Sequence, residues 1–267
     1  MSILSTIICL LLSSALSSQL LVPEGSQPEQ GWPAVVLLHD HGARFEKGWQ
    51  KVIGDNPEPY YSGMAIGDSL AAHGYVVYCM DALYWGSRRS ALSQRQFSDS
   101  LGGEGVWYAR VLAEDQQSVS YVRSLPYVDS TRIAVTGFSY GAYRAWNLAS
   151  EDPRIKVCIA AHWMTTLAQN RYNDSWLCMA RKPQRPFEVI ASEIAPRPFL
   201  LQYGTQDKLF PVSAVDSCVH YIDSVYQKTN DKRPMTNHAF RAESYDCGHV
   251  FTHEHLKNWL IWLKIHL

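Results

Sequence analysis

Short apolar runs alternate with longer segments of helical periodicity along most of the chain. Runs rich in Val, Ile, Leu and Tyr, with no polar face, are typical of strands buried on both sides of a parallel sheet. The predicted strands are Gln19–Val22, Ala34–His39, Tyr75–Met80, Arg132–Thr136, Ile155–Ala160, Phe199–Tyr203 and Phe240–Tyr245.

Helical periodicity marks the segments between these strands. In one of them, Leu112, Val119 and Val122 fall on a single helical face. The predicted helices are Met64–His73, Tyr108–Leu125, Tyr140–Ser150, Val212–Tyr226 and Thr252–His266. The stretch from Leu83 to Trp107 has weak periodicity, and we interpret it as a loop or a small cap above the sheet. The alternation predicts an α/β fold, with a mostly parallel twisted sheet covered by helices on both faces.

The first residues differ from the rest of the chain. Ile3–Leu16 is an apolar run broken by serines, and small residues at Ala15 and Ser17 suit a signal-peptidase site. We therefore expect a signal peptide over residues 1–18, export to a secreted or periplasmic location, and a single domain over residues 19–267. No Lys or Arg lies near Met1, which leaves a membrane anchor or a misassigned start codon as alternatives.

Net charge, hydrophobicity and cysteine spacing limit the partners and cross-links that we expect. The net charge is −1 and no basic cluster is present, so we expect no nucleic-acid partner. The N-terminal apolar run is too short for stable membrane insertion. The cysteines beyond it are odd in number and irregular in spacing, which is not a disulfide framework, although export would permit one bridge. They are Cys79, Cys158, Cys178, Cys218 and Cys247. The oligomeric state stays open.

The strongest chemical motif is Gly137-Phe138-Ser139-Tyr140-Gly141. It follows a predicted strand and opens a predicted helix, where a sharp turn exposes a serine hydroxyl at the carboxyl edge of the sheet. Glycines suit such a turn because larger side chains would clash. Ser139 is therefore the candidate nucleophile; the alternative is a glycine-rich turn with an idle serine.

A serine nucleophile needs a base, and this motif is followed along the chain by an acid and then a histidine. Asp207 lies just past the strand that ends at Tyr203, and His249 lies between the last strand and the last helix. Each could instead be an ordinary turn or surface-loop residue. We expect His253 and His255 to be exposed helix residues, and the spacing of the three histidines matches no HExxH metal site. No metal and no cofactor are expected.

The turn after the Ala34–His39 strand is the candidate oxyanion hole. In folds of this kind one backbone N–H comes from that turn and another from the residue after the nucleophile. This nominates the N–H groups of His41 and Tyr140, with Asp40 as the other candidate; the alternative is a turn with a histidine packed beneath it. Further residues follow strand ends and are candidate substrate contacts, although each could be core packing: Arg44, Trp85 and Trp163, with His162 and Met164 beside them.

The chain resembles the dienelactone hydrolase and acetyl-xylan-esterase-like branch of the α/β hydrolases in the segments LLHDHGARFEKGW, MDALYWG, GFSYGAYRAW, QDKLFP and CGHVF. The resemblance extends over Gln19–Leu267, and HDHGA and AHWMTTL are the segments that suggest the branch. It implies the α/β-hydrolase fold and a Ser139, His249, Asp207 triad. Dienelactone hydrolases proper typically use a cysteine nucleophile, so Ser139 argues for an esterase.

Together these features predict a serine carboxylic-ester hydrolase for short acyl esters, acetyl above all, with a small molecule or a carbohydrate as the alcohol. Three alternatives remain. The first is a serine peptidase similar to prolyl oligopeptidases, which usually carry a large extra domain for which this length leaves no room. The second is a methyl esterase of sugar acids, in which Arg44 would hold the uronate ring or a neighbouring carboxylate. The third is a non-catalytic binding protein on a hydrolase scaffold.

Overall fold

In the part of the chain that the structure describes, seven strands form one sheet in the order β1-β3-β2-β4-β5-β6-β7. The structure is a computed structural model that describes residues 17–55, 57–170, 185–230 and 239–267. The strands are β1 (Ser18–Leu21), β2 (Trp32–Leu38), β3 (Val76–Met80), β4 (Val128–Phe138), β5 (Val157–Ala161), β6 (Phe199–Gly204) and β7 (Phe240–Tyr245). Only β1 pairs antiparallel with its neighbour; every other pair is parallel. The predicted mostly parallel sheet is confirmed.

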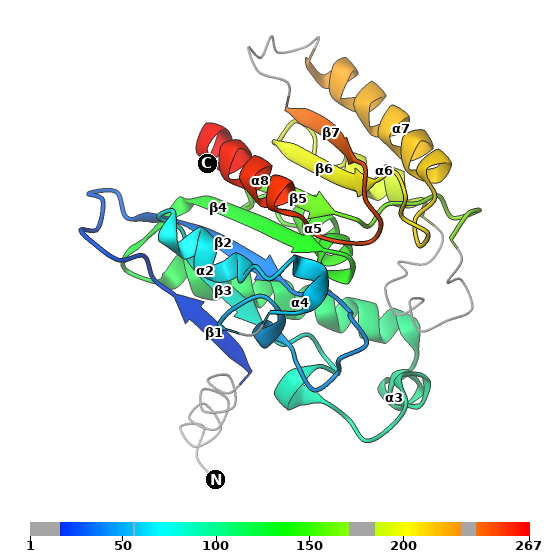
Figure 1. Cartoon of the computed structure of the whole chain (residues 1–267), viewed down its shortest axis with the longest axis horizontal. Helices are drawn as coiled ribbons and strands as arrows, with labels where there is room; N and C mark the ends of the chain where they lie inside the picture. The colour runs from blue at the N-terminus through cyan, green and yellow to red at the C-terminus, as the bar shows by residue number, and fades with distance from the viewer. Residues whose placement is uncertain (1–16, 56, 171–184, 231–238) are drawn as a thin grey trace.

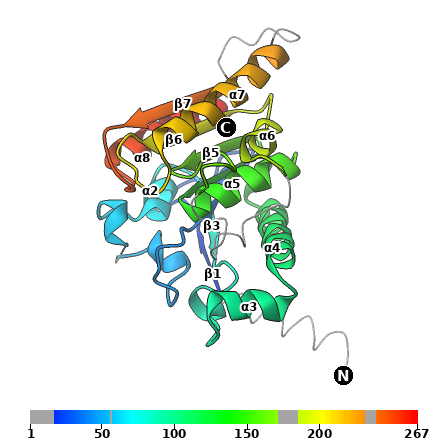
Figure 2. The same ribbon diagram turned by 90° about the vertical axis from the view of Figure 1, so that its right-hand side faces the viewer.

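Helices cover both faces of the sheet (Figures 1 and 2). One face carries α4 (Glu104–Ser124), α5 (Tyr140–Glu151), α6 (Phe187–Ser192) and α7 (Val212–Asn230). The other carries α2 (Ile66–Ala72) and α8 (His253–His266). Successive side chains of β2 point to opposite faces of the sheet, so Val36 packs on the face covered by α4 to α7 and Leu37 on the face covered by α2 and α8. The central strands are therefore buried on both sides, as the unbroken apolar runs predicted.

Two α-helices among the described residues, α3 (Gln94–Leu101) and α6, were not predicted. The stretch from Leu83 to Trp107, expected as a loop or cap, contains η3 (Gly86–Arg88), α3 and the first residues of α4. Its local signal was a capping box, in which Ser93 accepts from the Gln96 N–H and the Gln96 side chain accepts from Ser93. The other unpredicted helix is α6, which is too short for its periodicity to stand out. Short 3-10 turns, η1 (Trp49–Lys51) and η2 (Pro59–Tyr61), precede α2.

The described residues contain no helix that is both long and apolar enough to span a membrane. The predicted signal peptide falls mostly outside the described residues, which begin at Ser17. Among the cysteines that the structure describes, Cys79, Cys158, Cys218 and Cys247 are free thiols, while Cys178 lies outside the described ranges.

Parallel strands bring their carboxyl ends to one edge of the sheet, which is where α/β folds place functional groups. At this edge, β2 leads into the turn at His39–Gly42, β4 into Ser139, and β5 into His162. The loops after β6 and β7 carry Asp207 and His249. The topology thus gathers residues that are more than two hundred positions apart in the sequence.

Candidate active site

Ser139 occupies a strained turn between β4 and α5. Its φ is 55° and its ψ is −123°, a backbone conformation that non-glycine residues rarely adopt. The flanking glycines permit the turn: a Cβ at Gly137 would lie 2.2 Å from the Gly141 backbone, and one at Gly141 would lie 1.9 Å from the Leu38 carbonyl oxygen. The motif therefore forms the expected strand–turn–helix elbow with a half-buried serine at its tip.

Three side chains from separate loops form a hydrogen-bonded chain that begins at this serine. The Ser139 Oγ lies 2.9 Å from Nε2 of His249, and the other ring nitrogen of His249, Nδ1, lies 2.7 Å from Oδ2 of Asp207. A carboxylate only accepts hydrogen bonds, so Nδ1 carries the proton and Nε2 is free to accept from the serine hydroxyl. The structure brings together the three residues that the sequence nominated, in the order needed for proton transfer.

Asp207 is almost completely buried yet stays ionised. Burial pushes the pKa of its carboxyl upward, but hydrogen bonds from His162 and His249 outweigh that effect and hold the pKa well below its usual range. The Leu209 N–H donates to the second oxygen at 2.8 Å. The carboxylate is therefore available, with its charge, to orient His249 throughout the pH range in which esters are stable.

Sequence reasoning missed one member of this cluster. His255 was expected to be exposed, but it is fully buried, and its Nε2 lies 3.0 Å from Nε2 of His162. The prediction was wrong because the first turn of α8 packs inward, where His255 contacts His162 after β5 and Tyr245 of β7, and a local pattern does not show such contacts. His253, on the opposite side of the same turn, is exposed as predicted.

Two groups of described side chains have the spacing of metal ligands. One is His162, Cys247 and His255, and the other is His162, Asp207 and His249. The second group is the candidate triad with its neighbour. In the first group a hydrogen bond joins the two imidazoles directly, so both nitrogens already have a partner. These contacts account for the clustering without an ion.

The turn after β2 is fixed from three sides. Lys51, whose side chain is fully buried, donates from Nζ to the carbonyls of Asp40 (3.0 Å) and His41 (2.6 Å). Trp85 donates from Nε1 to the same His41 carbonyl at 2.9 Å. The Asp40 carboxylate accepts from two tyrosine hydroxyls, those of Tyr60 and Tyr61, each at 2.7 Å. This turn and Ser139 line the same cavity.

The second oxyanion candidate, Tyr140, is the first residue of α5. Its N–H lies in the first helical turn, where no carbonyl within the helix can accept it. The side chain is clamped: its ring stacks on Trp85 with centroids 5.5 Å apart, and the Arg144 guanidinium lies 5.8 Å from the ring centre. The backbone at this position is thereby held in place.

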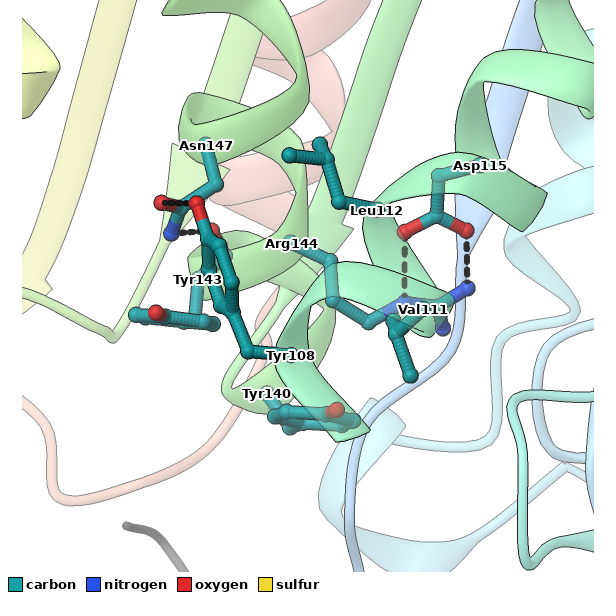
Figure 3. Close-up of a pocket in the computed structure, with 8 residues that line it drawn as sticks. All are labelled: Tyr108, Val111, Leu112, Asp115, Tyr140, Tyr143, Arg144 and Asn147. Atoms are coloured by element: carbon teal, nitrogen blue, oxygen red, sulfur yellow. Dashed lines mark hydrogen bonds and ion pairs between the residues drawn. The ribbon is translucent and has the colours of Figure 1, made fainter. Parts of the chain in front are cut away.

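Figure 3 shows what lies behind that clamp. Arg144 and Asp115 form a buried two-point ion pair, with contacts of 3.0 and 2.6 Å, and the Tyr108 hydroxyl donates to Asn147. The hollow between these side chains has a volume of about 10 Å³, which leaves room for one water molecule at most. This pocket contains no nucleophile and supports the elbow helix from behind.

The cavity over Ser139 is the candidate substrate site. Its volume is about 260 Å³. The side chains around the nucleophile are mainly aromatic or aliphatic, and the polar groups are those of the turn and the triad. The lining residues are Asp40, His41, Gly42, Ala43, Tyr60, Phe138, Ser139, Tyr140, Trp163, Leu209, Phe210 and His249.

Some of the predicted substrate contacts line this cavity and others do not. Trp163 lines the cavity. Trp85 does not: it is fully buried beneath the turn, so its predicted role in binding is corrected to one of support. Arg44 is exposed and also lies outside the lining, because its guanidinium pairs with Glu46 and approaches Glu58. Of the other two, His162 faces Asp207, and Met164 is buried in the core.

Comparison with known proteins places these features in a family. The model of the dienelactone hydrolase family matches residues 24–258. The putative hydrolase YtaP of Bacillus subtilis is 29% identical over 201 residues, which cover 73% of this chain and 67% of YtaP. A putative carboxymethylenebutenolidase of Methylorubrum extorquens is 29% identical over 137 residues, covering 51% of this chain and 43% of that protein.

Solved structures with the same fold include two carbohydrate esterases. A glucuronoyl esterase from Caldicellulosiruptor kristjansonii has a TM-score of 0.64 at 15% identity, covering 92% of this chain and 71% of its own. A putative acetyl xylan esterase from Bacteroides fragilis has a TM-score of 0.62 at 18% identity, covering 85% and 62%. At these identities the likeness shows the fold alone.

Proposed function

Because the chain belongs to the dienelactone hydrolase family and is a carboxylic ester hydrolase, we propose that Ser139 is its nucleophile and that it acts on short acyl esters of polar alcohols. One observation carries the assignment of the nucleophile. The strained elbow brings the Ser139 hydroxyl within hydrogen-bond distance of His249, which Asp207 orients from behind, and Ser139 and His249 line one cavity.

The geometry supports the following sequence of steps. His249 accepts the hydroxyl proton at Nε2 as Ser139 Oγ attacks the ester carbonyl, and Asp207 stabilises the imidazolium that forms. The N–H groups of Tyr140 and the turn at His41 stabilise the oxyanion, each contributing about 3 kcal/mol. His249 then protonates the leaving alcohol. Water, deprotonated by the same nitrogen, attacks the acyl-enzyme, and the acid departs with Ser139 restored.

The size and lining of the cavity favour a small acyl group. At about 260 Å³ it lies below the range of pockets that enclose drug-sized ligands. Trp163 is almost completely buried and Phe210 packs against it, with ring centroids 5.2 Å apart, so this wall is fixed. An acyl chain too long for the space beside this wall would crowd its side chains, which is unfavourable.

We assign the alcohol to the side of the cavity at His41, where polar groups are found. Helix α3, which lies over the turn after β2, places the Gln94 amide nitrogen 3.3 Å from Nε2 of His41. An enzyme for long-chain lipids would present an apolar face here. Of the two proteins with the same fold named above, the acetyl xylan esterase fits an acetylated sugar as substrate, whereas the glucuronoyl esterase fits an ester of a sugar acid.

Methyl esters of sugar acids are the competing substrate class. Arg44 was the residue expected to hold a uronate, but it already faces two carboxylates, which leaves acetyl esters as the better proposal. The test compares acetate release from acetylated xylo-oligosaccharides with methanol release from methyl glucuronate, using Ser139→Ala as the blank. Faster acetate release is expected. Faster methanol release, or cleavage of aminoacyl anilides in place of esters, would contradict the proposal and favour the methyl esterase or the peptidase.

We also propose export, supported by the small residues that follow the N-terminal apolar run. Ser18 already pairs with Met80 in β1, so cleavage before Ser18 leaves the whole strand in the mature protein. Sequencing the N-terminus of protein from its native host should find a start close to Ser17. An intact Met1 on protein inside the cell would contradict the proposal.

A further inference from the structure

Asp207 is held by two histidines. His249 and His162 both place Nδ1 on the same carboxylate oxygen, Oδ2, at 2.7 and 3.0 Å. The triad mechanism uses only His249. His162 follows β5 directly, is almost completely buried and does not line the cavity, so it has no direct access to a substrate.

His162 has a strained backbone conformation, and in this conformation its ring faces Asp207. Its φ is 59°, in the left-handed region that non-glycine residues seldom occupy. Across from it, a Cβ at Gly204 would lie 2.9 Å from the His162 ring, so the close approach of β6 depends on the absence of a side chain there. Such strain persists only where surrounding contacts maintain it, and it is concentrated at functional sites.

Neighbouring hydrogen bonds fix every proton in this cluster. The Thr252 N–H donates to Nδ1 of His255 at 3.1 Å, so His255 carries its own proton on Nε2. That N–H donates to Nε2 of His162, 3.0 Å away, which leaves the His162 proton on Nδ1, facing Asp207. Tyr245 stacks on the His255 ring at 3.9 Å and holds it in place.

From this arrangement, and given the proposed triad, we propose that His162 is a positioning residue for ester hydrolysis. Its neutral imidazole holds the Asp207 carboxylate in the orientation that aligns His249. His255 is the second positioning residue, because it occupies the one nitrogen at which His162 could take up a proton.

Because His162 is neutral, it can hold Asp207 without cancelling the charge of the carboxylate. The titratable groups that face it are Asp207, His249, His255 and Cys247. Burial lowers the pKa of His162, and burial lowers that of His255 to about 3. A proton on His162 would place a second cation beside Asp207 and weaken the stabilisation that this carboxylate gives to the His249 imidazolium.

Two substitutions at one position separate donation from packing. His162→Asn keeps an N–H donor and tolerates the left-handed backbone, whereas His162→Leu fills the space without a donor. We expect His162→Leu to lower kcat by about tenfold to a hundredfold with KM little changed.

His162→Asn should restore most of kcat, because it returns the donor. A folded His162→Leu with wild-type kcat would overturn the proposal, as would a His162→Asn that is as impaired as His162→Leu. His255→Phe keeps the ring that stacks on Tyr245 but removes the N–H, and it serves if His162→Leu fails to fold. It should also lower kcat with KM little changed; wild-type kcat would overturn the proposal.

Labelling by a fluorophosphonate distinguishes a failure of this inference from a failure of the triad. Wild-type protein labelled at Ser139, together with His162 variants that behave like wild type, would contradict only the role of His162. Wild-type protein that is not labelled would contradict the proposed nucleophile itself.

Discussion

Lys51 donates from a fully buried ammonium to the carbonyl of His41, 2.6 Å away, in the turn that faces the nucleophile. Burial lowers the pKa of this lysine, while the Asp40 carboxylate, 3.7 Å away, opposes that effect. An uncompensated buried charge is costly, so the pair persists because the ammonium also satisfies two carbonyls.

Lys51→Met should therefore destabilise the protein and lower kcat together. Loss of the ammonium leaves Asp40 buried without its counter-charge, at a cost of about 3–5 kcal/mol in the free energy of unfolding. Urea unfolding measures this. Lys264→Met, the same change at an exposed position on α8, is the control and should change stability by less than about 0.5 kcal/mol. Equal stability of the two variants would show that the buried pair contributes nothing.

Mild acid should lower the stability of the folded protein. His39 accepts the Ala82 N–H at 2.9 Å and His255 accepts the Thr252 N–H, so both are neutral when folded. Burial lowers the pKa of both, that of His255 to about 3. Below about pH 6.5 the unfolded chain binds protons that the folded chain does not, which removes up to about 1.4 kcal/mol per pH unit for each histidine.

The corresponding measurement is the melting temperature from pH 7 to pH 5, followed by circular dichroism. It should fall steadily across that interval. Asp207 also has a depressed pKa, so its contribution to stability is lost in the same direction, but only below about pH 4, outside the interval. A melting temperature that is the same at pH 5 and pH 7 would show that these histidines are not held neutral.

Asp207→Asn should lower kcat by about 10³- to 10⁴-fold while the protein stays folded. The amide cannot accept at both ends as the carboxylate does, because its NH2 group would face either the two histidines or the Leu209 N–H, so His249 loses its tautomer and its orientation. The control is Asp246→Asn, which removes the same charge from an exposed residue one loop away. If kcat falls by the same small factor in both variants, Asp207 is not the acid that orients His249.

The rate should fall with acyl length, from nitrophenyl acetate to butyrate, and be negligible for octanoate. The fixed wall formed by Trp163 and Phe210 is the physical reason. Specificity constants for the three esters are the measurement. Octanoate as the best substrate would mean that the cavity opens to accommodate lipid chains.

The sequence predicted the elements whose signals are local. The elbow at Ser139 was visible because two glycines, a strand and a helix coincide within a few residues. Chain order then nominated Asp207 and His249, and the structure brings both to the serine. The parallel sheet followed from apolar runs, because strands buried on both faces carry few polar residues.

What the sequence did not predict depends on distant contacts. Lys51 is a buried cation, which composition would place at the surface; only the carbonyls of the turn after β2 explain its position. His255 lies on the inner side of α8 and was therefore misjudged. His162 shares the strand-end position of the triad residues, which made it a candidate substrate contact, but its contact with Asp207 depends on how the loops pack and was not predicted.

The most direct test of the central claim is labelling of the folded protein with a fluorophosphonate, followed by peptide mass mapping. An activated serine attacks the probe, so the wild-type protein should gain one label, located on Ser139. Ser139→Ala should gain none, should lose nearly all esterase activity, and should keep the wild-type circular dichroism spectrum. A label on another residue, or a folded Ser139→Ala that retains more than about a tenth of the activity, would contradict the account.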